Sequence, residues 1–595
     1  MAAIQYHAHK KENADATLAR VKKKITTNAF SRFAAFASIF GFMFGMAETS
    51  LILAVCCSIL SLIAFLALVG HHVRLHKKRK YWQAVSIICT NEIEACNHVF
   101  SSFQSGKGYI DPKHTYSYDL DLFGSGSVFQ MINRTVTTAG EKKLADILLH
   151  GNTNVRQIII KQESIMELAS TPDLLTHFRA VGSTSEIVEE DKKKIGNWTN
   201  TKSYVSNNRT LNIIRILFPS LTLLSLVFLI SAGTGALLFV SLFLLNLTIT
   251  GFFFKKTNVE HNRVSAFLNL LKKYKGLLSS FGHLHFSSEL LQDIVSELHN
   301  EHGHAETALS DLSKKVNAFD SRLNFVAAIV LQGLLLWDFQ CLFGIEKWRQ
   351  NYGQHLLKWL STIAEFDSLV SMATYAFNNP NYIYPNPNAA TILETKGIGH
   401  PLIPASVRVA NSFLADKKGG FIIITGANMA GKSTFLRTIG VNLVLAMAGM
   451  PVCAETFNFK PTNLFTSMRT SDSLSENESY FYAELRRLKE IIDSLEEGKE
   501  LFIILDEILK GTNSVDKQKG SQMGLEKILR LGGTGIIATH DLALTKIEEK
   551  HPGKIKNQCF EVEIDNTTIK FDYKLYNGVT QKMNAIILME QMGII

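Results

Sequence analysis

The sequence predicts a multidomain protein in which an α/β domain with a phosphate-binding loop follows an all-α core, together with two apolar helical hairpins. Three observations carry this prediction. A strand, a glycine-rich loop and a helix start follow one another over residues 421–439. Leucines recur at helical spacing over residues 267–278, and four long apolar runs lie in the N-terminal half. A chain of 595 residues is also long enough for several domains.

We expect five segments along the chain. They are an N-terminal lead with a transmembrane hairpin (1–75), a helical linker with the first part of the helical core (76–205), a second transmembrane hairpin (206–256), a helical lever with the second part of the core (257–388), and a P-loop domain (389–595). Residues 378–388 are rich in Asn and Pro and mark the linker before the last segment.

The glycine-rich loop is the most specific feature of the chain. The predicted nucleotide-binding residues are Gly426, Asn428, Met429, Ala430, Gly431, Lys432, Ser433 and Thr434. Backbone N–H groups of the turn and of the helix start point toward phosphates, and Gly431 lets the backbone approach closely. Lys432 adds a point charge, and Ser433 offers a hydroxyl to Mg²⁺. An ordinary glycine turn is the alternative, and the strand–loop–helix order argues against it.

Two later strands end in polar residues suited to nucleotide hydrolysis. The apolar run 501–505 ends in Asp506 and Glu507. Asp506 can hold Mg²⁺, and Glu507 can polarise the attacking water. The run 534–539 ends in His540, which can bind a γ-phosphate. A lone histidine is more often structural, but the order of these elements favours an ABC-type P-loop ATPase that uses ATP and Mg²⁺.

Several of these segments resemble the MutS family of DNA mismatch-repair ATPases. Residues 425–437 (TGANMAGKSTFLR), 505–514 (LDEILKGTNS) and 538–542 (ATHDL) look like its ATP motifs, and 465–481 looks like the signature segment between them. Residues 399–403 are similar to the segment that introduces its ATPase domain. Residues 129–140 and 365–373 resemble the two ends of its helical core. The resemblance covers roughly residues 118–595, with a gap.

The resemblance implies specific roles and a dimer. It implies that the loop residues hold the phosphates and Mg²⁺, that Asp506 assists the metal, that Glu507 is the general base and that His540 contacts the γ-phosphate. Ser479 matches the serine that reaches a partner's ATP, although Asn477 and Glu478 precede it where the family has Gly-Gln or Gly-Arg. Because the chain stops at Ile595, where the family continues into a helical clasp, we expect an ATP-dependent homodimer of heads.

The four apolar runs predict a multi-pass membrane protein. They cover residues 30–46, 51–69, 216–230 and 236–254. Three reach the length that spans a bilayer, and the run 216–230 does so when it is extended back toward Leu211. Lys and Arg flank both hairpins, whereas the turns between the runs have none. The positive-inside rule therefore places the ATPase on the cytoplasmic side of the inner membrane. Core helices of a soluble protein are the alternative.

The N-terminal half departs from a mismatch sensor. The family inserts a Phe-x-Glu motif into DNA, and this sequence contains none. The leading functional interpretation is an ATP-hydrolysing, DNA-binding protein related to mismatch repair, anchored in the membrane and without mismatch specificity. The alternative is a membrane-tethered ATPase switch that acts on a protein or lipid partner and does not read DNA.

Composition adds smaller constraints. The net charge of +9 is modest, and the basic residues cluster at the membrane flanks, which favours topology signals and anionic lipid contacts over a DNA surface. Seven cysteines without a C-x-x-C pair indicate a reduced environment. His299, His302 and His304 are close in sequence, but surface positions explain them better than a metal site. Residues 325–343 are apolar but interrupted, and we expect a core helix there.

Overall fold

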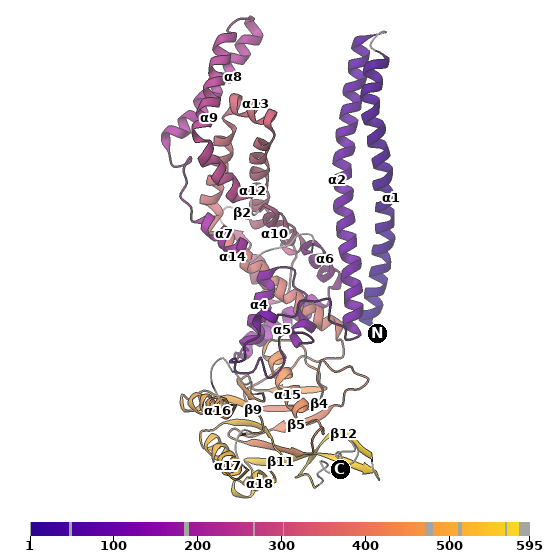
Figure 1. Ribbon diagram of the computed structural model, residues 1–595, viewed down its shortest axis with the longest axis vertical. Helices are drawn as coiled ribbons and strands as arrows, with labels where there is room; N and C mark the ends of the chain where they lie inside the picture. The colour runs from indigo at the N-terminus through magenta and orange to yellow at the C-terminus, as the bar shows by residue number, and fades with distance from the viewer. Residues whose placement is uncertain are drawn as a thin grey trace.

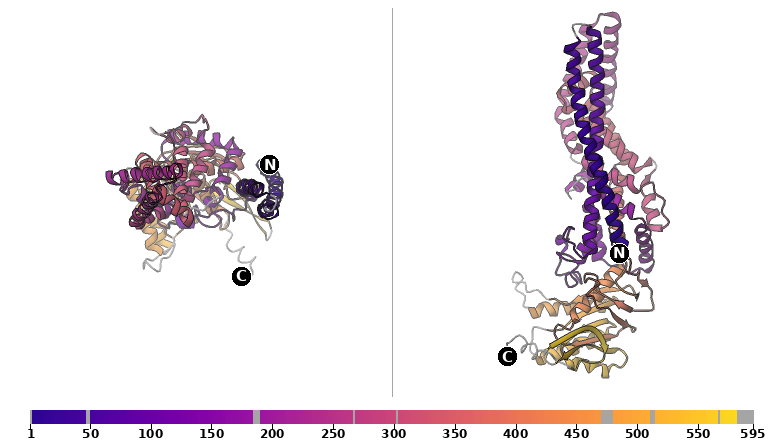
Figure 2. Two further views of the ribbon diagram at one scale, coloured as in Figure 1. Left: turned by 90° about the horizontal axis from the view of Figure 1, so that it is seen from above. Right: turned by 90° about the vertical axis from the view of Figure 1, so that its right-hand side faces the viewer.

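The computed structural model describes residues 2–46, 50–183, 190–265, 268–300, 303–469, 480–509, 514–565 and 568–581. These residues form an elongated molecule with three parts (Figure 1). An α/β head lies at one end, a helical core follows it, and two separate helical hairpins extend away from the head. Both hairpins point in the same direction, and their tips reach similar heights (Figures 1 and 2).

The first hairpin consists of α1 (Ala2–Gly45) and α2 (Leu51–Cys96). Ser50 caps α2, because its hydroxyl accepts a hydrogen bond from the Leu53 N–H. Large apolar side chains are exposed around the far half of the hairpin, including Phe44 at 79% and Ile52 at 78%. In a water-soluble protein, such a contiguous apolar surface would be costly, so this half is suited to an apolar surrounding.

The second hairpin consists of α8 (Arg209–Ala232) and α9 (Ala236–Ser265). Gly233 and Gly235 adopt positive φ angles of 66° and 90° in the turn, which glycine accommodates without strain. Among the described helices, α2, α8 and α9 are long and apolar enough to cross a membrane. A bent pair of helices, residues 305–335, brings the number to as many as four. The helix α1 does not reach this level, because Arg32 and several small or polar residues interrupt its apolar run.

The core is built from short helices packed around one long helix, α14 (Trp337–Asn378). A small antiparallel pair, β1 (His299–Asn300) and β2 (Gly303–His304), precedes α12. The remaining elements of this part are η1 (Lys107–Tyr109), α3 (Val128–Ile132), α4 (Thr138–Leu149), α5 (Val155–Ala169), α6 (Pro172–Gly182), α7 (Glu190–Thr199), α10 (Leu268–Phe281), α11 (Glu289–Ser296), α12 (Ala305–Phe319), η2 (Asp320–Leu323) and α13 (Phe325–Leu335).

A buried ionic cluster joins the first hairpin to the core. Glu92 of α2 is fully buried, and its carboxylate lies 2.7 Å from Arg134 Nε and 2.6 Å from Arg179 Nη2. The side-chain amide of Asn378, the last residue of α14, donates a further hydrogen bond to Glu92. His7 of α1 contacts Asn378 in turn. Charged groups this deeply buried are retained only when each is paired, so the cluster fixes how the hairpin meets α14.

The head contains two sheets. The larger has six strands in the order β12-β11-β6-β10-β9-β8, all parallel except β12. The smaller has four strands in the order β3-β7-β4-β5. The strands are β3 (Asn386–Pro387), β4 (Leu393–Ile398), β5 (Asn411–Ala415), β6 (Phe421–Gly426), β7 (Thr456–Phe459), β8 (Asn463–Ser467), β9 (Leu501–Asp506), β10 (Thr534–Ala538), β11 (Ile555–Asp565) and β12 (Thr568–Asn577). The helices are α15 (Lys432–Met447), α16 (Tyr480–Glu496), α17 (Ser514–Arg530), α18 (Leu542–Thr545) and α19 (Ile547–Lys550).

Strand burial explains the apolar runs of the head sequence. Every residue of β6 is buried, as are the residues of β10 and most of β9, because helices cover both faces of a parallel sheet. The combination of mixed α/β sheets with many helices confirms the multidomain prediction at this coarse level.

Two sequence expectations differ from the structure in detail. The boundaries placed at residues 75 and 256 fall inside α2 and α9. Each apolar segment and the polar segment after it therefore form one continuous helix. Residues 325–343 do not form one helix. Leu336 adopts a left-handed conformation between α13 and α14, and α13 packs on the second hairpin.

Candidate nucleotide-binding site

The carboxyl ends of three parallel strands meet at one edge of the large sheet. Strand β6 ends at Gly426, β9 ends at Asp506, and β10 between them ends at Ala538. Ligands of open α/β sheets bind at this kind of edge. A cavity of about 640 Å³ opens there, large enough for a nucleotide.

The loop between β6 and α15 has a backbone that requires glycine. Gly426 has φ 153° and Gly431 has φ 103°. A side chain at Gly426 would come within 2.8 Å of the Phe560 carbonyl, so only hydrogen fits there. Met429, with φ 66°, is 74% exposed. The loop thus directs the N-terminus of α15, with its free N–H groups, into the cavity.

Lys432 is folded into the loop that it follows. Its ammonium donates to the carbonyls of Gly426 at 2.8 Å and Ala427 at 2.9 Å, and it lies 3.2 Å from His540 Nε2. Burial lowers the pKa of Lys432 to about 8, although Asp506 and Glu507 oppose this shift. Burial, followed by the nearby Lys432 charge, also lowers the pKa of His540. Both pKa shifts are consistent with a neutral His540 imidazole whose Nε2 accepts a hydrogen bond from the Lys432 ammonium.

Glu507 lies at the centre of a charged group. Its backbone has φ 58°, and its N–H donates to the Ala538 carbonyl at 2.9 Å, which anchors it to β10. Its carboxylate lies 3.9 Å from His540 Nε2 and 3.6 Å from Lys517 Nζ. The side chain is 17% exposed and therefore reaches solvent in the cavity. This placement allows Glu507 to take a proton from a water molecule there.

The structure brings most of the sequence-predicted residues together. The cavity is lined by Asn428, Met429, Ala430, Gly431, Lys432, Ser433, Thr434, Asp506, Glu507 and His540. Gly426 is not among the lining residues, but its carbonyl accepts a hydrogen bond from Lys432. Ser479 lies outside the described residues.

Sequence reasoning missed the other side of the cavity. Residues from β4, the following loop, β5 and β12 complete the lining, among them Ile398, His400, Ile403, Val407, Asn411 and Tyr573. Burial lowers the pKa of His400 to about 4, so it is neutral there. The Tyr573 ring lies so close to Gly431 that a side chain at Gly431 would come within 3.1 Å of it. No local spacing joins these residues to the glycine-rich loop, because they come from β4, β5, β12 and the loop between β4 and β5.

The start of the signature segment is held by the chain that precedes the core. The Asp119 carboxylate accepts hydrogen bonds from the N–H groups of Met468 and Arg469 and from the Thr466 hydroxyl. Asp121 pairs with the Arg469 guanidinium through two bonds of 2.5 and 2.9 Å. These contacts tie residues 466–469, at the start of the signature segment, to Asp119 and Asp121.

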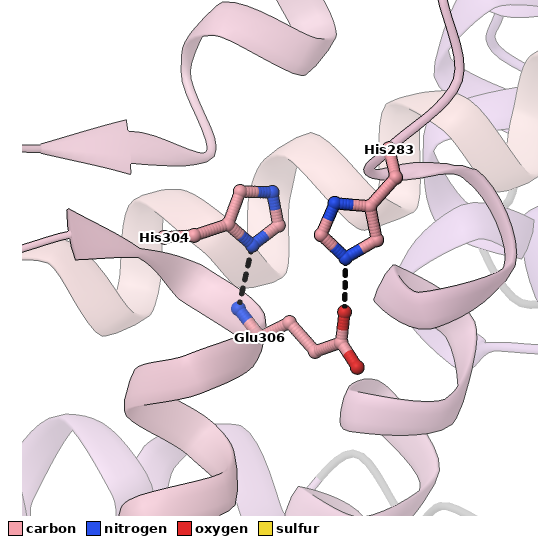
Figure 3. A group of neighbouring side chains, drawn as sticks. All are labelled: His283, His304 and Glu306. Atoms are coloured by element: carbon pink, nitrogen blue, oxygen red, sulfur yellow. Dashed lines mark hydrogen bonds and ion pairs between the residues drawn. The ribbon is translucent and has the colours of Figure 1, made fainter.

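A second polar group, in the core, contains His283, His304 and Glu306 (Figure 3). His304 caps α12, because its Nδ1 accepts the Glu306 N–H at 3.1 Å, and this places the ring proton on Nε2, 3.3 Å from the Gly282 carbonyl. His283 Nε2 pairs with the Glu306 carboxylate at 2.7 Å. A metal ligand needs an unprotonated nitrogen facing the ion, and both His304 nitrogens are engaged otherwise. Capping and pairing therefore account for this group. His302 lies outside the described residues.

Comparisons with known proteins agree with the geometry of the head. Residues 422–594 match the family model described as MutS domain V. The DNA mismatch repair protein MutS of Fusobacterium nucleatum is 31% identical over 245 residues, which cover 40% of this chain and 27% of that protein. MutS protein homolog 4 of Homo sapiens is 31% identical over 239 residues, covering 38% and 25%. Endonuclease MutS2 of Thermus thermophilus is 31% identical over 196 residues, covering 33% and 25%.

Fold and site together define a multidomain protein with a helical core and a mixed α/β head that carries a glycine-rich loop at its sheet edge. Within this head, residues 422–594 match the model of MutS domain V, and the chain is similar to proteins of the MutS family. The similarity covers only about a quarter of the length of these relatives.

Proposed function

We propose that this protein is a membrane-anchored ATPase of the MutS type that binds DNA and is related to mismatch repair. The observation that carries the ATPase part is the convergence of Lys432, Asp506, Glu507 and His540 on one cavity. Each supplies one requirement of phosphoryl transfer to water: a cation for the phosphates, a metal-binding carboxylate, a base and a γ-phosphate contact.

The residues of the cavity fit ATP and Mg²⁺. The Ser433 hydroxyl and the Asp506 carboxylate line the cavity and are the oxygen donors that Mg²⁺ prefers. When bound, the metal neutralises charge on the phosphate oxygens. The loop amides and Lys432 bind the phosphates. On binding, the Lys432 ammonium gives up its hydrogen bonds to the loop carbonyls and donates to phosphate oxygens instead. Ile398, Ile403 and Val407 offer an apolar surface for the base at the other end of the cavity.

Hydrolysis then depends on Glu507. Its carboxylate orients a water molecule and accepts its proton, while His540 remains neutral and donates to the γ-phosphate. Lys517 Nζ and His540 Nε2 lie 3.6 Å and 3.9 Å from the Glu507 carboxylate and flank it in the cavity. We further propose that ATP brings two heads together and that Ser479 of each reaches the partner's site.

Membrane anchoring is supported by the exposed apolar halves of the two hairpins. The spanning windows of α2, α8 and α9 are only 6%, 17% and 11% buried within the protein. Large apolar surfaces of this kind are covered by lipid in a spanning helix. Because both hairpins extend away from the head, one membrane can receive both while the head stays in the cytoplasm (Figures 1 and 2).

The DNA part is supported by the relatives, two of which are named for mismatch repair or an endonuclease activity. The alternative is an ATP-driven membrane switch with a protein or lipid partner. The absence of Phe-x-Glu from the sequence and the Glu92 connection between the first hairpin and α14 favour that alternative.

ATP turnover with and without DNA distinguishes the two functions. The full chain, in lipid nanodiscs, is assayed with matched and mismatched duplexes at low and moderate salt. We expect DNA to stimulate turnover, salt to weaken binding steeply, and a mismatch to change affinity by less than tenfold, about 1.4 kcal/mol. Turnover that DNA does not change, without binding at low salt, would select the membrane switch. Lys432→Ala is the control for contaminating ATPases.

A further inference from the structure

We propose that α13 is a third membrane contact, a re-entrant helix that enters the cytoplasmic leaflet beside the second hairpin and packs against lipid acyl chains. This inference rests on the proposed membrane anchoring and extends it to a part of the core. Residues 325–335 contain no charged side chain, and Gln332 is the one strongly polar residue among them.

The exposed side of α13 is strongly apolar. Phe325 is 77% exposed, Val326 70% and Val330 45%, and Leu323 just before the helix is 73% exposed. These side chains continue the exposed apolar surface of α8 and α9, on which α13 packs. A core helix of a water-soluble domain would turn such residues inward. Lipid is therefore the occupant that matches both the chemistry of this face and its position beside the hairpin.

The depth of α13 follows from its contacts with α9. Asn246, fully buried in the apolar part of α9, donates to the Gly333 carbonyl at 2.8 Å and to the Thr222 hydroxyl at 3.0 Å. Asn246 precedes Phe254, the last apolar residue of that run, by about 12 Å along the helix axis. The hydrocarbon of one leaflet is about 15 Å thick. Gly333, in the last turn of α13, thus lies within the hydrocarbon of the cytoplasmic leaflet.

Close packing at this point depends on Gly333. A side chain there would come within 2.2 Å of the Phe243 ring. Small residues let membrane helices approach each other in this way, and the Asn246 hydrogen bonds hold the two backbones together.

An ion pair joins the segments before and after α13. The axis turns by 111° between residues 305–323 and α13, and Leu336 reverses the chain after it. Arg322, before the helix, and Asp338, after it, approach to 3.2 Å with nearly complete burial of both side chains. The Arg322 guanidinium also lies 5.2 Å from the centre of the Phe254 ring. Since α13 has 11 residues and is about 16 Å long, it is too short for a span of about 30 Å and must return.

Fluorophores at single cysteines test this placement. In a cysteine-free full chain that retains wild-type ATPase activity, NBD is attached at Val326→Cys or Val330→Cys. Leu224→Cys in α8, 67% exposed, is the lipid control, and Met523→Cys in α17 of the head, 69% exposed, is the aqueous control. The proteins are reconstituted in phosphatidylcholine–phosphatidylglycerol vesicles. Iodide quenches NBD from water, and lipids brominated on the acyl chains quench it from the bilayer.

We expect positions 326 and 330 to follow position 224: quenched by brominated lipid and at least fivefold less accessible to iodide than position 523. If positions 326 and 330 follow position 523 while 224 stays in lipid, α13 lies outside the membrane and only this inference fails. If position 224 is also quenched by iodide as strongly as position 523, the hairpin itself is not inserted, and the proposed anchoring fails with it.

Discussion

The Asn378 side-chain amide donates a 2.7 Å hydrogen bond to the carboxylate of Glu92, a residue 286 positions earlier in the chain. Glu92 belongs to the helix that begins in the first hairpin, and Asn378 ends the helix that leads to the head. One buried contact therefore connects the proposed membrane segment to the last core residue before the head.

Replacing Glu92 with Gln should destabilise the protein strongly. The substitution leaves the buried guanidinium groups of Arg134 and Arg179 without a counter-charge, and breaking a buried pair in this way costs about 3–5 kcal/mol. Urea unfolding of the protein in detergent measures the change. Glu94→Gln, at an exposed position two residues later, is the matched control and should change the free energy of unfolding by less than about 0.5 kcal/mol.

The same cluster predicts a loss of stability in acid. Burial alone would raise the pKa of Glu92, but Arg134 and Arg179 overcome it and hold the pKa at about 2. Since the folded pKa is below the unfolded value, the stabilisation is present above the unfolded pKa of about 4.5 and is lost as pH falls toward 2. The difference in the free energy of unfolding between wild type and Glu92→Gln should therefore shrink by about 2 kcal/mol between pH 6 and pH 3. A constant difference would show that Glu92 is not ionised in the cluster.

Glu507→Gln should retain ATP but hydrolyse it slowly. The amide keeps the shape of the side chain and removes the base, so turnover should fall by about 10²–10⁴-fold. Phosphate release measures turnover, and a fluorescent ATP analogue measures binding. Glu549→Gln, on an exposed position of the head, should behave as wild type. Wild-type turnover in Glu507→Gln would assign the base to another residue.

ATP affinity should weaken as pH rises above 8. The phosphates bind the charged form of Lys432, whose pKa is lowered to about 8 by burial in the nucleotide-free protein. His540, Asp506 and Glu507 face it, and none of these has an ordinary pKa between 7 and 9. The dissociation constant should therefore rise about tenfold from pH 7 to pH 9. Isothermal titration measures it. Lys432→Arg, which stays charged, should show no such rise even if it binds more weakly at both pH values.

The turn of the second hairpin should face away from the cytoplasm. Thr234→Cys lies in that turn, and Lys546→Cys lies at an exposed position of the head. In a cysteine-free chain in intact cells, an impermeant thiol reagent should label position 234 and not 546. Both positions should react after the membrane is permeabilised. Labelling of 546 alone in intact cells, or recovery of the chain in the soluble fraction without detergent, would contradict the proposed topology.

Local patterns in the sequence predicted one side of the nucleotide cavity and not the other. Lys432, Asp506 and His540 each follow an apolar strand, and parallel strands bring their ends to one edge. His400, in the loop after β4, and Tyr573, in β12, reach the cavity only through the arrangement of two sheets. In the same way, nothing local pairs Glu92 with Asn378. The apolar run 325–343 looked like one core helix because its break, at Leu336, depends on the Gln332 and Asp338 side chains meeting across the bend.

The helix α2 continues from the apolar run 51–69 to Glu92 without a joint. With that run in the bilayer, the helix places Glu92 about 35 Å below the membrane surface. The length of the hairpin between the bilayer and Glu92 thus sets a fixed distance between the membrane surface and the head. A partner that touches both the head and the bilayer must fit this gap.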